Sequence, residues 1–132
     1  MSDDVKTKLK DVDAERAVLA GCLKDVDNID KAMLNCNPTY FTEALYRNLF
    51  KIATQAYTRY GSLLTQEFLS NVLEANGYAQ DVRLAYLKAM DDLATVSVNN
   101  AEFGFALAAL RRAFISSSVS DILTAGTQAL DG

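Results

Sequence analysis

Apolar residues recur at three- and four-residue spacings along most of the chain, which is the pattern of amphipathic helices. The first such segment spans residues 13–24, with Asp13 placed to cap its N-terminus. A second begins at Asp27 or Asn28 and ends before Pro38, the one proline of the chain. Their expected buried positions are Ala14, Val18, Leu19, Cys22 and Leu23 in the first helix and Ile29, Ala32, Met33 and Cys36 in the second.

Three further helices are predicted in the middle of the chain. Thr42 is a plausible N-cap for a long helix that ends at Gly61, Thr65 for a helix that closes at Gly77, and Asp81 begins a third. The expected buried positions are Leu45, Leu49, Ile52, Ala53, Ala56, Tyr57, Tyr60, Phe68, Leu69, Val72, Leu73, Val82, Ala85, Tyr86, Ala89, Met90 and Leu93. Residues 95–99 alternate but are too few for a sheet, so we expect an extended connection.

The sixth helix, from Asn100 to about Ala129, has two apolar faces. At roughly 100° per residue, one stripe contains Phe103, Leu107, Leu110 and Phe114, and the other contains Ile115, Val119, Ile122 and Leu123. These elements predict an all-α, six-helix orthogonal bundle. We expect a flexible tail over residues 1–12, a helical head over 13–98 and a long terminal helix over 99–132.

The second stripe of this terminal helix is the candidate interaction site. A head that buries the first stripe leaves the second stripe facing away from it. The last part of the chain has too few charged residues to be stable alone in water. We therefore predict that Ile115, Val119, Ile122 and Leu123 meet another helix, in a second copy of the chain or in a partner. The alternative is that the serines at 116–118 bend the helix back onto its own core.

Length and charge restrict the classes of function. A chain of 132 residues that is 50% hydrophobic and 23% charged forms one ordinary domain, and no apolar run reaches the length of a membrane span. The N-terminus lacks a secretory signal pattern, so we expect a cytoplasmic protein. The formal net charge of −4 has no basic cluster, which argues against strong direct binding of nucleic acid.

The chemistry of catalysis is missing from the sequence. Without histidine, no Ser-His or Cys-His nucleophile can form, and no phosphate-binding glycine loop occurs. Cys22 and Cys36 fit structural thiols rather than a metal site or a disulfide, and the adjacent Asp91 and Asp92 diverge on a helix. We expect no enzyme activity, no cofactor and no metal in this chain.

Several segments, in order along residues 13–125, resemble the N-terminal domain of DnaB-type hexameric replicative helicases. Ala20, Tyr46 and the missing proline near Gly61 depart from that family's pattern and indicate a divergent member, such as a viral one. The matching segments are Ala14-Glu15-Arg16-Ala17-Val18-Leu19 with Leu23 and Asp25; Phe41, Tyr46-Arg47 and Leu49-Phe50, then Tyr57 and Gly61; Leu84-Ala85-Tyr86-Leu87 with Leu93; Asn100-Ala101-Glu102-Phe103 with Ala106; and Leu110-Arg111-Arg112 with Ile115.

The resemblance implies a non-catalytic oligomerisation and docking domain of a replicative DNA helicase. In that family a helical head is followed by a helical hairpin, hairpins pair between subunits, and the collar so formed sits on an ATP-hydrolysing motor and docks primase or a loader. The terminal helix would be the first arm of the hairpin, and its second stripe would join subunits into a dimer or ring. The motor is absent from this sequence, so we expect a fragment or a short relative.

Two other readings remain. A free-standing helicase loader or inhibitor would be built on the same head. A small helical DNA-binding protein would use the fourth and fifth helices as a helix-turn-helix, although the second of these offers only Arg83 and Lys88 as cations.

Overall fold

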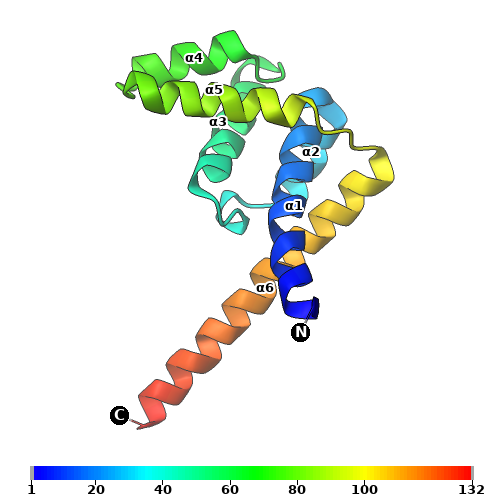
Figure 1. Ribbon diagram of the computed structural model, residues 1–132, viewed down its shortest axis with the longest axis vertical. Helices are drawn as coiled ribbons and strands as arrows, with labels where there is room; N and C mark the ends of the chain where they lie inside the picture. Colours follow the sequence, from blue (N-terminus) through cyan, green and yellow to red (C-terminus); the bar gives the residue numbers. More distant parts are fainter. Residues whose placement is uncertain (1, 132) are drawn as a thin grey trace.

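The computed structural model describes the backbone of residues 2–131 and the side chains of residues 12–115. In this part of the chain it contains six α-helices and one short 3-10 helix, without a strand, and the predicted all-α class is confirmed (Figure 1). The elements are α1 Ser2–Lys24, α2 Val26–Asn35, η1 Pro38–Tyr40, α3 Ala44–Tyr60, α4 Gln66–Ala75, α5 Gln80–Ala94 and α6 Asn100–Asp131.

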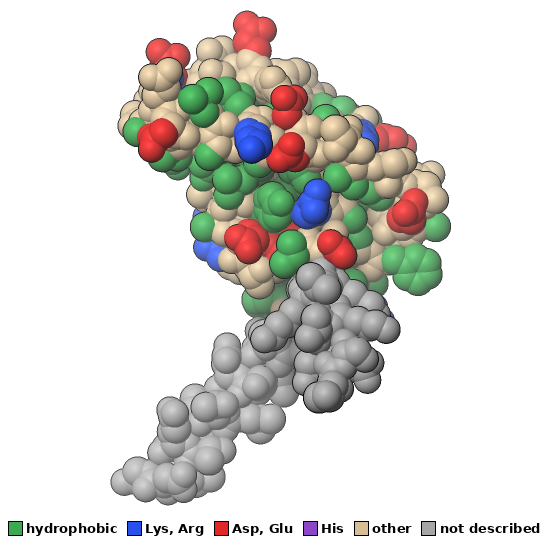
Figure 2. Space-filling model, viewed as in Figure 1, with side chains coloured by type: hydrophobic (Ala, Val, Ile, Leu, Met, Phe, Trp, Pro, Cys, Tyr) green, Lys and Arg blue, Asp and Glu red, His purple; other side chains and the backbone are tan. Residues whose placement is uncertain are grey.

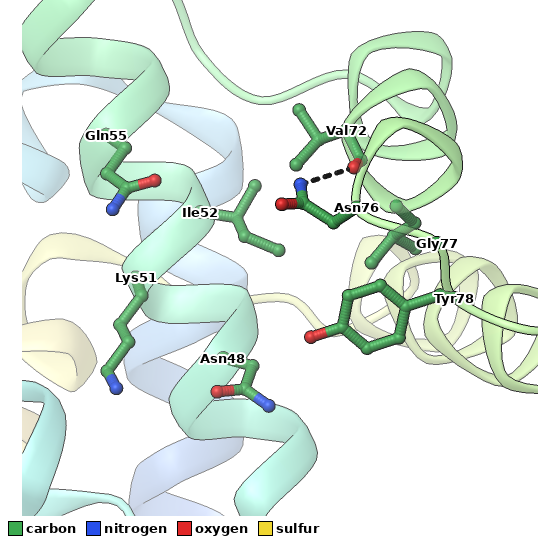
Figure 3. A pocket seen from close by; sticks show the side chains of 9 residues that line it. Asn48, Lys51, Ile52, Gln55, Val72, Asn76, Gly77 and Tyr78 are labelled. Atoms are coloured by element: carbon green, nitrogen blue, oxygen red, sulfur yellow. Dashed lines mark hydrogen bonds between the residues drawn. The ribbon is translucent and has the colours of Figure 1, made fainter.

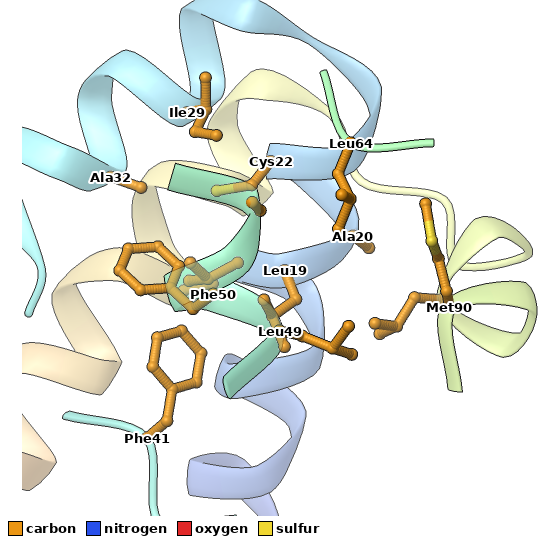
Figure 4. Close-up of a cluster of buried hydrophobic side chains, with 14 of the residues drawn as sticks. Leu19, Ala20, Cys22, Ile29, Ala32, Phe41, Leu49, Phe50, Leu64 and Met90 are labelled. Carbon is orange, nitrogen blue, oxygen red and sulfur yellow. The ribbon is translucent and has the colours of Figure 1, made fainter. Parts of the chain in front are cut away.

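Helix α1 lies at the centre of the head. It packs against α6, α2, α3 and α5, while α4 packs on α5 as its antiparallel neighbour (Figure 1). The largest side chains that α1, α3 and α6 bury together are aromatic or branched, and Figure 4 shows part of this core. The core includes Val18, Leu19, Ile29, Phe41, Leu49, Phe50, Leu69, Leu73, Leu93, Phe103 and Leu110, each no more than 2% exposed.

A glycine sets the distance between α1 and α6. A Cβ atom placed on Gly21 would come within 2.3 Å of Cδ1 and 2.6 Å of Cε1 of Phe103, distances that real side chains do not reach. The carbonyl of Gly21 also accepts a hydrogen bond of 3.2 Å from Nδ2 of the buried Asn28. Gly21 therefore lets the Phe103 ring lie directly on the α1 backbone, while Asn28 ties α2 to the same point.

The sequence signals for the end of α3 and for the starts of α4 and α6 are confirmed. Oγ1 of Thr65 accepts from the Phe68 amide at 3.1 Å, and Gly61 has the left-handed φ of 66° that the end of α3 requires. At the start of α6, Asn99 and Glu102 form a reciprocal capping box with bonds of 2.8 and 3.1 Å. The pattern identified Thr65 and Gly61, because both signals are local in sequence, and it placed the start of α6 at Asn100 without the capping box.

Other helix starts differ from the prediction. Helix α1 begins at Ser2 rather than at Asp13, because residues 2–12 contain neither glycine nor proline and their charges do not break a helix. Helix α2 begins at Val26, one or two residues earlier than expected, and is capped by Asp25, whose carboxylate accepts from the Asp27 amide at 2.9 Å. Helix α5 begins at Gln80 instead of Asp81. The flexible tail over residues 1–12 stays a prediction.

Thr42 does not cap α3 as expected: Glu43 is the N-cap residue, and no side chain caps the first turn. Glu15 of α1 instead binds the backbone just before the helix. The Glu15 side chain is fully buried, and its Oε1 accepts from the backbone amides of Thr42 and Glu43 at 3.0 and 3.2 Å. Its Oε2 accepts from the Thr42 hydroxyl at 2.6 Å. A carboxylate from another helix thus satisfies the free amides next to the N-terminus of α3.

Several positions predicted to be buried are exposed. Helix α5 buries Tyr86, Met90 and Leu93, whereas Val82 and Ala85 before them are exposed. Met33 of α2 and Tyr60 at the end of α3 are exposed as well. Periodicity shows which side of a helix is apolar, but how far the neighbouring helices cover that side depends on their arrangement in space.

Candidate protein-interaction surface

The inner face of α6 is the first apolar stripe that the sequence predicted. Phe103, Leu107 and Leu110 are buried against the head. Phe114, one turn further on, stacks on Tyr40 with the ring centroids 4.5 Å apart and the planes inclined by 27°. This stripe fixes α6 to α1 and to the segment around η1, and the prediction for its four members is confirmed.

The outer face of the same helix carries a second row of apolar residues. Phe105 is 75% exposed and Ile115 is 47% exposed, and the exposed Ala108 lies between them. Spacings of three and four residues link positions 105, 108, 112 and 115, so these residues share one side of α6. We call Phe105, Ala108, Arg112 and Ile115 the outer stripe.

The outer stripe extends the predicted interaction site toward the head. Of the four predicted residues, Ile115 is exposed as expected, while the side chains of Val119, Ile122 and Leu123 lie outside the described residues. The apolar face does not simply change halfway along α6, because the described half already presents apolar residues on both sides. The sequence analysis missed Phe105 and Ala108, although the heptad spacing that leads from them through Ile115 to Val119 and Ile122 was available as a signal.

A groove of about 510 Å³ lies between α2 and this part of α6. Its apolar lining on α6 consists of Gly104, Leu107, Ala108 and Ile115, and no atom would meet a Cβ placed on Gly104 within 4 Å. The cations at its border are Lys31, Arg111 and Arg112. Small residues on its floor permit close approach of another backbone, and an apolar floor with a charged rim is typical of a helix-binding groove.

The described surface shows no basic patch and no metal site. Acidic and basic side chains are interspersed on the face seen in Figure 2, without a basic patch. No group of three histidine, cysteine or carboxylate side chains is placed to hold a metal ion within the part of the chain that the structure describes. Among those residues no helix is long and apolar enough to cross a membrane.

Both cysteines are free thiols rather than a disulfide. Burial raises the pKa of Cys22 well above its ordinary value, and the nearby Cys36 adds to the effect. Burial also raises the pKa of Cys36 to about 12, although a hydrogen bond with the Asn37 backbone opposes the shift. Thiolates are the reactive form, so neither thiol is activated as a nucleophile near neutral pH.

The α4–α5 pair is poorly equipped to read DNA. Gly77, with φ of 78°, forms the turn between the two helices, but Arg83 of α5 is directed at Glu74, 3.7 Å away. Lys88 is exposed in the neighbourhood of the acidic Asp91 and Asp92. This leaves one unpaired cation for the helix that would enter a groove of DNA.

The comparison with protein families gives one result. The family model described as "DnaB-like helicase N terminal domain" matches residues 7–104, which contain α2 to α5, most of α1 and the first turn of α6. No curated protein and no solved structure matches the chain.

Proposed function

Because the chain belongs to the family of DnaB-like helicase N-terminal domains, we propose that it joins helicase subunits and docks their partners, without catalysing a reaction itself. In this role it forms part of the collar of a replicative DNA helicase and receives primase or a helicase loader. The complete helicase would hydrolyse ATP in a separate motor domain. The observation that carries the proposal is the outer stripe of α6, which leaves large apolar side chains uncovered beside an apolar groove.

The energetics of the outer stripe support self-association. Full burial of a side chain such as Phe105 or Ile115 contributes roughly 1.5–3 kcal/mol, and association must first overcome a cost of at least about 4 kcal/mol in lost freedom. Since Phe105 is 75% and Ile115 47% exposed, only that part of each value remains to be gained, and the two described residues of one chain stay below the threshold. A seam that continued through Val119 and Ile122 would exceed it, which favours a long helix–helix contact over a single point of contact.

The groove between α2 and α6 supplies a second layer of the same contact. Gly104 and Ala108 hold no bulk that would keep a helix away, while Lys31, Arg111 and Arg112 border the groove with positive charge. A chain with a formal net charge of −4 has carboxylates available to face these cations. We therefore expect a dimer or a ring of this chain to cover the outer stripe and the groove together.

Aspartate substitutions on the outer stripe test the proposal. Phe105→Asp with Ile115→Asp should abolish self-association, because burying two unpaired carboxylates is too costly, while the helix content stays nearly unchanged since both side chains lie outside the core. Sedimentation velocity measures the association and circular dichroism the helix content. The matched control is Leu84→Asp on α5, which changes a side chain of 58% exposure away from α6 and should leave association intact.

Two results would count against this role. If the doubly substituted chain unfolds, the two side chains belong to the head and not to an interface. If it stays folded and associates as strongly as the Leu84→Asp control, the outer stripe is not the contact surface. Aspartate at both Ile122 and Leu123 should also separate the subunits. If that change leaves association intact while the change at Phe105 and Ile115 abolishes it, the contact is confined to the head-proximal half of α6.

A further inference from the structure

A second groove runs between α3 and α4, on a part of the head that the self-association surface does not use. Two adjoining hollows of about 530 and 310 Å³ form it. Both are lined by Ile52 and Gln55 of α3 and by Val72 and Asn76 at the α4 side, so they are parts of one channel. We call this the α3–α4 groove.

The groove exists because its two walls are anchored to different elements. Helix α3 packs on α1, whereas α4 packs on α5. A hydrogen bond of 2.8 Å from Asn48 Nδ2 to the Tyr86 hydroxyl ties α3 to α5 at one end. Figure 3 shows that Ile52 points across the gap toward Val72 and that the Tyr78 hydroxyl points toward α3. The two walls meet at the far end, where the rings of Tyr60 on α3 and Phe68 on α4 lie with their centroids 5.6 Å apart, and they leave the groove open between these two ties.

The chemistry of the lining is basic and amide-rich around an apolar centre. Among the described side chains, Lys51 and Arg59 are the only charged ones that line the two hollows. Neither cation is in an ion pair within the described residues, where Arg83 and Glu74 form the one salt bridge. Gln55 forms no side-chain hydrogen bond to any described residue either, and Ile52 and Val72 supply the apolar centre. No carboxylate of residues 12–115 lines this channel, although the chain has more carboxylates than cations.

We propose that the α3–α4 groove docks an acidic amphipathic helix of another protein, a proposal that rests on the docking role given above and names its surface. Lys51 and Arg59 are separated by two turns of α3, or about 12 Å along the axis. Carboxylates seven or eight residues apart on a partner helix that runs beside α3 match this separation. A large apolar side chain between them fills the space over Ile52 and Val72, and Gln55 and Asn76 offer amide groups to the partner.

The aromatic residues at the two ends favour a protein partner over a nucleic acid. Single strands bind to basic channels by stacking bases on free aromatic rings. Here Tyr60 packs edge-on against Phe68, with centroids 5.6 Å apart, and Tyr78 packs edge-on against Tyr86 at 5.9 Å. Each ring already has an aromatic neighbour, although Tyr60 stays 63% exposed, and two cations alone give too few phosphate contacts for a nucleic-acid channel.

Binding of designed peptides tests the proposal. The first probe is a fluorescein-labelled synthetic helix with two glutamates seven residues apart and a leucine midway between them, and the matched probe has glutamine in place of both glutamates. Fluorescence anisotropy with the unmodified chain should show at least about tenfold weaker binding of the glutamine peptide. Amide shifts of the isotope-labelled chain on adding the first peptide should concentrate on residues 48–60 and 72–78.

Charge reversal in the chain supplies the second arm. Lys51→Glu should weaken binding of the glutamate peptide by at least about tenfold, whereas Lys88→Glu, which changes the net charge equally on exposed α5, should leave it within about twofold. Arg59→Glu should behave like Lys51→Glu. A version of the peptide with lysines for glutamates should regain affinity for the chain that carries both reversals.

Three results would overturn the proposal. The first is that the glutamate peptide shows no saturable binding, and the second is that Lys51→Glu leaves its binding unchanged. The third is that a single-stranded oligonucleotide of equal charge displaces the peptide. The self-association of each variant is measured alongside by sedimentation. If a variant loses peptide binding but still associates, the result supports docking in the α3–α4 groove. If the chain binds the peptide but never associates, docking in the groove stands and the proposed assembly role is contradicted.

Discussion

The hydrogen atom that Gly21 has in place of a side chain fixes how closely α1 approaches α6. The Phe103 ring occupies the space that any larger residue would need. Gly104 on α6 has open space instead. Gly21 is therefore required for packing, whereas Gly104 leaves an exposed stretch of backbone uncovered. Comparing the same substitution at both positions isolates the packing effect.

Gly21→Ala should destabilise the fold by about 1–3 kcal/mol, because the added methyl group overpacks against the Phe103 ring. Gly104→Ala should instead be neutral or stabilising by up to about 1 kcal/mol, since alanine favours a helix and meets no neighbour. Urea unfolding followed by circular dichroism measures both. Phe103→Leu should recover part of the loss in the Gly21→Ala chain, and equal stability of the two alanine variants would contradict the close approach.

For single residues, the sequence predicted burial in the core well but did not show the residues that make a close contact with a distant segment. Val18, Leu19, Leu49 and Phe103 are buried as their spacing predicted, because one helix face decides burial. Gly21 gave no sign of its role, since the atom it would strike lies far along the chain on α6. A contact between distant segments leaves no mark in local periodicity.

Among the elements, α3 depends on α1 for its beginning. The buried carboxylate of Glu15 accepts three hydrogen bonds from Thr42 and Glu43. Capping residues usually lie next to the helix that they cap. The sequence therefore predicted Thr42 as the cap of α3, and it gave no sign that Glu15 of another helix binds there. The structure instead uses Glu15 to fix the angle at which the chain enters α3 from the turn after η1.

Glu15→Ala should lower the free energy of unfolding by about 2–3 kcal/mol, because it leaves three donors without their charged acceptor. Glu67→Ala, in the exposed first turn of α4, should change it by no more than about 0.5 kcal/mol. Urea unfolding distinguishes the two. Equal effects would mean that Glu15 contributes no more than a surface charge, and its role in placing α3 would then be wrong.

Helix boundaries were predictable where their signals are contiguous. Thr65 and Gly61 act within a few residues of the ends that they set, and both were identified from the sequence. The start of α1 was not, because a polar segment without breakers reads equally as a tail or as a solvated helix. The exposure of Val82 and Ala85 in α5 was not predicted, because it depends on how far the neighbouring helices extend over that side of α5.

The whole molecule combines a head that buries one face of α6 with a helix that leaves its other face open. The sequence predicted the all-α class, the family and the exposed position of Ile115. It did not predict that the outer stripe begins at Phe105, or that α2 forms a groove beside it. Both depend on how α2 and α6 lie relative to each other, which only the folded arrangement determines.

The mass of the unmodified chain in solution tests the central claim, that the outer stripe of α6 is covered by a second copy. Sedimentation equilibrium over a wide range of concentrations should show a mass that rises above the 14.4 kDa of one chain as concentration increases. A particle that stays at 14.4 kDa up to high concentration would contradict the claim.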